Sequence, residues 1–123
     1  MNRWISVGAL SAALAVALGA FGAHGLKDHV DAAALENWRT GVLYHVLHAL
    51  ALVLYGLWLE RRSTSAWPAW CFLFGSTVFS ATLYLMVLGG PRWLGAITPF
   101  GGTALLAGWI GFAIQAWPRR EAR

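Results

Sequence analysis

Charge is scarce in this sequence, and that scarcity excludes several classes of protein. Only 11% of the 123 residues are Asp, Glu, Lys or Arg, while 59% are hydrophobic; an ordinary soluble domain carries about 25% charged residues. The formal net charge is +4, but no basic run exceeds two residues, so the chain lacks the basic patch by which proteins bind nucleic acid. The lone cysteine, Cys71, excludes a disulfide within the chain.

Four apolar runs are present instead, at about residues 4–23, 41–59, 67–88 and 96–117. Each approaches the roughly 20 residues that a helix needs to cross a bilayer, and a backbone inside lipid satisfies its hydrogen bonds by forming helices. The first run is longer than the core of about 7–15 residues in a signal peptide. The prediction is an all-α, four-helix transmembrane bundle with short loops, a single integral membrane domain over residues 1–123 surrounded by lipid.

Residues 24–40 are the longest polar connection. Asp31 is a suitable N-cap, and the AAALENW segment that follows is rich in helix-forming residues. We therefore expect a helical connection after the first span, which either lies at the membrane interface or continues into the second span. Its apolar side would carry Leu26, Val30, Ala34 and Trp38.

The positions of Lys and Arg predict the orientation, because cytoplasmic loops carry an excess of these residues. The N-terminus, the second loop and the C-terminus share one side of a four-span protein and hold Arg3, Arg61, Arg62, Arg119, Arg120 and Arg123. The other side holds Lys27, Arg39 and Arg92. Both termini are therefore expected to be cytoplasmic.

Two histidines, His45 and His48, interrupt the second apolar run. Ionisable side chains inside spans usually face the bundle interior or a cavity, so the stripe that contains His48 and Tyr55 is expected to face inward. Alternating helix directions place polar groups of all four spans in the non-cytoplasmic half. The candidate ligand-binding residues are His24, Tyr44, His45, His48, Ser80, Tyr84 and Thr98.

Several interpretations of this cluster remain open. Its members could hydrogen-bond one another and fix the packing, as in a structural or accessory protein. They could bind a lipid or small amphiphile, or a metal or haem held by His24 and His48, since imidazole suits these groups. An enzyme is disfavoured because no nucleophile or carboxylate accompanies the histidines in the spans. We expect His48 to be neutral and to contact His24, Tyr84 or a carbonyl near Thr98.

Small residues form stripes on the first and last spans. Such residues let a neighbouring helix approach closely, either within one bundle or between the protomers of a homo-oligomer or a larger membrane complex. The stripe on the first span comprises Gly8, Ala12, Ala15, Gly19 and Gly22, and that on the last comprises Gly101, Ala104, Gly108 and Gly111.

Four segments carry a resemblance to a known family. GAFGAHGL at 19–26, YHVLHALAL at 44–52, FSATLYLMVLGG at 79–90 and ITPFGGTALLAGW at 97–109 resemble the small membrane proteins grouped as domain of unknown function 423. The resemblance implies four spans and a bacterial inner-membrane location, and it implies no reaction and no cofactor. The matching positions are His24, Tyr44, His48, Ser80, Tyr84, Thr98, Pro99, Gly101 and Gly102. The family pattern often lacks a histidine at His45.

Overall fold

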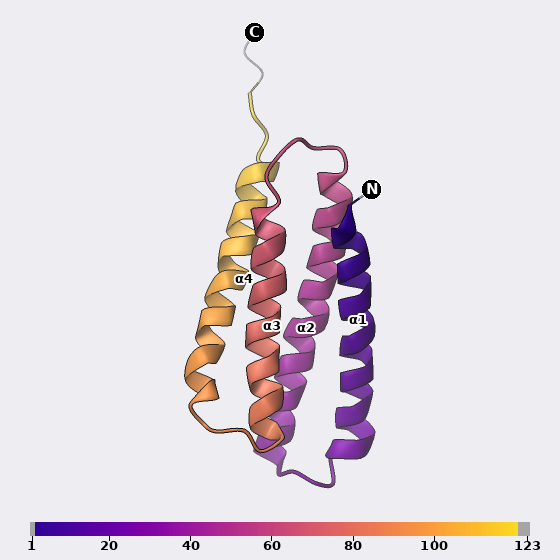
Figure 1. Cartoon of the computed structure of the whole chain (residues 1–123), viewed down its shortest axis with the longest axis vertical. Helices are drawn as coiled ribbons and strands as arrows, with labels where there is room; N and C mark the ends of the chain where they lie inside the picture. Colours follow the sequence, from indigo (N-terminus) through magenta and orange to yellow (C-terminus); the bar gives the residue numbers. More distant parts are fainter. Residues whose placement is uncertain (1, 121–123) are drawn as a thin grey trace.

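The computed structural model describes residues 2–120, and four long helices make up most of that range (Figure 1). They are α1 (Arg3–Phe21), α2 (Ala32–Leu59), α3 (Trp67–Val87) and α4 (Leu94–Ala116). A π-helical turn, η1 (Gly22–Leu26), extends α1. All four helices are long and apolar enough to cross a membrane, and the described residues contain no strand. The predicted all-α fold of four transmembrane helices is confirmed.

Consecutive helices run in opposite directions, so the first and last described residues lie at the same end of the bundle (Figure 1). Of the two arrangements expected for residues 24–40, the structure has the second: α2 begins at Ala32 and continues without a break into the apolar run. The Asp31 carboxylate caps it by accepting a hydrogen bond of 2.8 Å from the Ala34 backbone N–H. Arg123, which the predicted orientation counts, lies outside the described residues.

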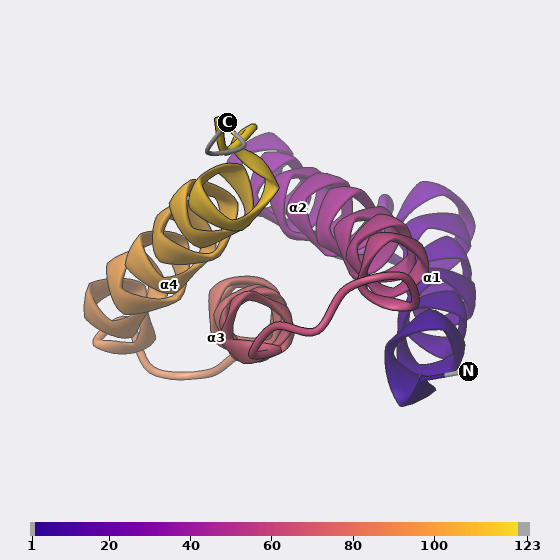
Figure 2. The ribbon, with the colours of Figure 1, turned by 90° about the horizontal axis from the view of Figure 1, so that it is seen from above.

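Helices α2 and α3 are the inner pair of the bundle. Viewed from the end, α1 and α4 lie on opposite sides of the α2–α3 pair (Figure 2). Helix α1 packs on α2, α2 on α3, and α3 on α4. The largest set of buried residues belongs to α2: Trp38, Gly41, His45, His48, Ala49, Ala51, Leu52, Tyr55 and Gly56. Whatever polar groups α2 carries on these faces must find partners inside the protein.

Glycines bring α1 close to α2. A Cβ added at Gly8 would lie 2.8 Å from the Ala49 carbonyl oxygen, and one at Gly22 would lie 2.5 Å from the Trp38 ring. The Trp38 ring occupies the space above Gly22 and donates its Nε1–H to the Leu18 carbonyl, at 2.9 Å. Gly19 is less crowded, since its nearest neighbour would be 3.3 Å away.

The contact between α3 and α4 also depends on glycine. A Cβ at Gly101 would lie 2.5 Å from the Phe79 backbone nitrogen, and a Cβ at Gly108 would lie 2.9 Å from the Phe72 ring. Gly111 leaves room for the Trp67 ring. Pro99 lies inside α4 rather than in its first turn, because the helix begins at Leu94. The α4 glycines therefore face α3.

Two adjacent glycines of α4 provide a matched test of this packing. Gly101→Ala is expected to destabilise the protein by about 1–3 kcal/mol, because the added methyl group meets backbone that cannot move aside. Gly102→Ala is expected to stay within about 0.5 kcal/mol of the parent, because its Cβ would meet only the Phe79 ring at 3.8 Å. Unfolding in detergent measures both, and equal stability of the two variants would contradict the packing described here.

Candidate functional site

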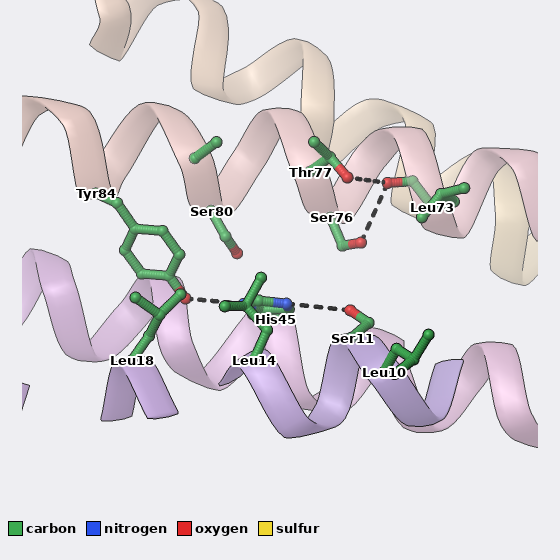
Figure 3. A pocket seen from close by; sticks show the side chains of 11 residues that line it. Leu10, Ser11, Leu14, Leu18, His45, Leu73, Ser76, Thr77, Ser80 and Tyr84 are labelled. Atoms are coloured by element: carbon green, nitrogen blue, oxygen red, sulfur yellow. Dashed lines mark hydrogen bonds between the residues drawn. The ribbon is translucent and has the colours of Figure 1, made fainter. Parts of the chain in front are cut away.

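His45 lies at the middle of α2 and joins three helices. It lies thirteen positions after Ala32 and fourteen before Leu59, which puts it about 20 Å from either end of the helix. Its Nδ1 lies 3.1 Å from the Tyr84 hydroxyl on α3, and its Nε2 lies 3.1 Å from the Ser11 hydroxyl on α1 (Figure 3). Ser11, His45 and Tyr84 are called the His45 triad below.

The backbone around Gly41 positions Tyr84. Gly41 precedes His45 by one turn, and a Cβ there would lie 2.9 Å from Tyr84 Cε1. The absence of a side chain thus lets the phenol ring lie against α2. One turn earlier on α3, the Ser80 hydroxyl donates to the Gly41 carbonyl at 2.7 Å. This contact fixes the spacing of α2 and α3 beside the triad.

The triad lies in a groove between α1 and α3 (Figure 3). The groove has a volume of about 380 Å³, which is within the range of small-molecule pockets. Apart from the triad its lining comprises four leucines, one alanine and three hydroxyl residues of α3. The lining residues are Leu10, Ser11, Leu14, Leu18, His45, Leu73, Ser76, Thr77, Ser80, Ala81 and Tyr84.

His48 forms a separate contact between α2 and α4. The Trp109 Nε1–H donates to His48 Nε2 at 3.0 Å. Because Nε2 accepts, a neutral imidazole carries its hydrogen on Nδ1, which donates to the Tyr44 carbonyl at 2.7 Å. Both ring nitrogens of His48 therefore have partners, and its side chain is only 5% exposed. The Tyr44 ring stacks beside it and is itself exposed at the protein surface.

The partners predicted for His48 are wrong. His45 and His48 differ by about 60° around the helix axis, so only His45 reaches Tyr84, while His48 faces Trp109. Thr98 pairs instead with Thr82 of α3, with 2.6 Å between the hydroxyl oxygens. The polar groups of the four helices thus form separate contacts rather than one cluster.

His24 also lies apart from the two buried histidines. It is exposed in the π-helical turn η1 and lies thirteen residues beyond Ser11, about 20 Å along α1. Ser11 is level with His45, so His24 and His48 do not converge. Residues 2–120 contain no group of three potential metal ligands from His, Cys, Asp and Glu. The metal or haem interpretation therefore has no ligand set in this part of the chain.

Comparison with known proteins identifies the family. A family model described as "Protein of unknown function (DUF423)" matches residues 18–102. The chain belongs to this family.

Relatives in the DUF423 family resemble the chain along almost its whole length. The UPF0382 membrane protein of Staphylococcus epidermidis is 40% identical over 115 residues, which cover 93% of this chain and 94% of the relative. The UPF0382 membrane protein YwdK of Bacillus subtilis is 40% identical over 119 residues, covering 94% and 97%. No solved structure matches significantly. These relatives are named membrane proteins, and four helices of this chain are long and apolar enough to cross a membrane. The protein is therefore a small multi-pass protein of the lipid bilayer.

Sequence reasoning missed three residues that form important contacts. Ser11 is a single hydroxyl in an Ala-rich run, and Trp109 resembles any interfacial aromatic residue. Gln115 carries the only side-chain amide in α4, and that isolation was a usable signal. Its Oε1 accepts from the Tyr55 hydroxyl at 2.6 Å, and its Nε2 donates to the Ser65 carbonyl at 2.8 Å. This network ties the α2–α3 loop to α4.

Proposed function

We propose that this protein is a non-enzymatic accessory component of the bacterial inner membrane, built as a single integral membrane domain whose polar groups hold its helices in place. One observation carries this proposal: every buried side-chain nitrogen and oxygen among the described residues has a hydrogen-bond partner. Hydrogen bonds between helices stabilise a membrane bundle without any ligand, so these contacts have a sufficient explanation in packing. Neither buried histidine has a carboxylate, thiol or lysine among its hydrogen-bond partners.

The contact between His48 and Trp109 provides the test of this packing role. His48→Leu leaves the Trp109 N–H without its acceptor, and we expect a loss of about 1 kcal/mol in the free energy of unfolding. Trp109→Phe in the same chain removes that unpaired donor. The loss of stability in the double variant should therefore be smaller, by a coupling of about 0.6 kcal/mol, than the sum of the losses in the two single variants. Unfolding of the parent, the single variants and the double variant in detergent gives the coupling.

Trp117→Phe is the matched control, because the Trp117 side chain is 74% exposed. Combined with His48→Leu, it should show no coupling. Zero coupling between His48 and Trp109 would mean that their contact contributes nothing to packing, and the packing proposal would then lose its support.

We infer that both termini face the cytoplasm. The end of the bundle at which the described residues begin and end holds Arg3, Arg61, Arg62, Arg119 and Arg120. The opposite end holds Lys27, Arg39 and Arg92. The excess of positive charge at the first end is typical of the cytoplasmic side.

Reporter fusions test this orientation. A reporter after Arg62 is expected to be active in the cytoplasm, and one after Gly90 is expected to be active on the outer side. Gly90 suits the second fusion because it lies between α3 and α4, where the chain turns. A Gly90 reporter that is active in the cytoplasm would contradict the orientation.

The groove at the His45 triad favours a second function, which is binding of a small amphiphile from the lipid. It opens between two helices rather than at the ends of the bundle. Apolar walls with a few convergent polar groups are the usual composition of a small-molecule site. A lipid-soluble molecule would reach this groove sideways, without leaving the membrane.

A further inference from the structure

The His45 triad has one hydrogen more than its own contacts use. A neutral imidazole supplies one N–H, and Ser11 and Tyr84 supply one O–H each. The two contacts of His45 consume two of these three hydrogens. If Nδ1 carries the imidazole hydrogen, the Tyr84 hydrogen is left over; if Nε2 carries it, the Ser11 hydrogen is left over. Both hydroxyl groups line the groove, so one donor is available there in either tautomer.

The hydrogens of the other hydroxyl groups in the groove already have acceptors. Ser76 and Thr77 both donate to the Leu73 carbonyl, at 3.3 and 2.7 Å, and Ser80 donates to Gly41. The groove thus offers one donor to an occupant, and no charged residue lines it.

The depth of the triad restricts what that occupant can be. His45 is level with Ser11, which lies eight positions after the start of α1 at Arg3 and ten before its end at Phe21, about 12 and 15 Å along the axis, while the hydrocarbon core is about 30 Å thick. Phospholipid headgroups lie outside this core, and acyl chains carry no hydrogen-bond acceptor within it. A charged molecule at this depth would be costly. The occupant must therefore be neutral and apolar and must carry its own acceptor.

We propose that the groove binds the ring carbonyl of a membrane-soluble quinone, which accepts the spare hydrogen of the His45 triad. Such a molecule brings a neutral carbonyl and an apolar tail into the bilayer, and the leucines of α1 pack against its ring and tail. This inference rests on the amphiphile binding proposed above, and it adds the chemical class of the ligand.

The experiment compares two probes on the full chain by native mass spectrometry. One is a benzoquinone with a decyl tail, and the other is a benzene ring with the same tail and no carbonyl. The parent protein is expected to bind the quinone about tenfold more tightly, which corresponds to one hydrogen bond. In the variant Ser11→Ala/His45→Leu/Tyr84→Phe, no donor of the triad remains, and the two probes should bind equally.

Two control variants test whether the probes bind in the groove, and they separate amphiphile binding from the preference for a quinone. Thr77→Val keeps the shape of the groove and removes a hydroxyl whose hydrogen is already committed, so the preference for quinone should persist. Ala81→Phe fills the groove and should abolish binding of both probes.

If the parent binds both probes equally and Ala81→Phe blocks both, the groove binds amphiphiles but the quinone proposal is overturned. If neither probe binds, or if Ala81→Phe has no effect, groove binding and the quinone proposal both fail. A triple variant that does not fold leaves the comparison of the two probes on the parent to decide.

Discussion

A polar side chain at the centre of a bilayer must find its hydrogen-bond partner inside the protein, and the arrangement of this bundle follows from that constraint acting on α2. His45 and His48 are three residues apart, so they project about 60° apart around the helix. His45 can then reach Ser11 of α1 and Tyr84 of α3, while His48 reaches Trp109 of α4. These two imidazoles connect α2 to every other helix.

Small residues make those contacts geometrically possible. The Tyr84 ring can reach His45 because Gly41 has no side chain, and α1 can bring Ser11 to the same level because Gly8 lies against the α2 backbone. Dispersion forces and hydrogen bonds thus act together, as expected where lipid removes the hydrophobic drive between helices. The open side of the triad is the groove, where packing ends and one donor is unused.

The four helices and their antiparallel order were predictable from the sequence, because apolar runs separated by polar turns determine both. The start of α2 was not predictable, since the second apolar run begins at Gly41 in the sequence while the helix begins at Ala32. The sequence predicted that His45 lies in the non-cytoplasmic half of the bundle, whereas it lies at the middle of α2. The partner of His48 was not predictable. Periodicity gives the direction of a side chain but does not say which helix lies there. Ser11 gave no signal, since a hydroxyl in a span usually bonds to its own helix.

Imidazole nitrogen NMR of the protein in lipid nanodiscs tests most directly whether His45 joins α1 and α3, with its signals assigned by their loss in His45→Leu. The account predicts a neutral ring with both nitrogens hydrogen-bonded. Tyr84→Phe should chiefly move the Nδ1 signal, and Ser11→Ala should chiefly move the Nε2 signal. Signals of His45 that neither substitution moves would contradict the account.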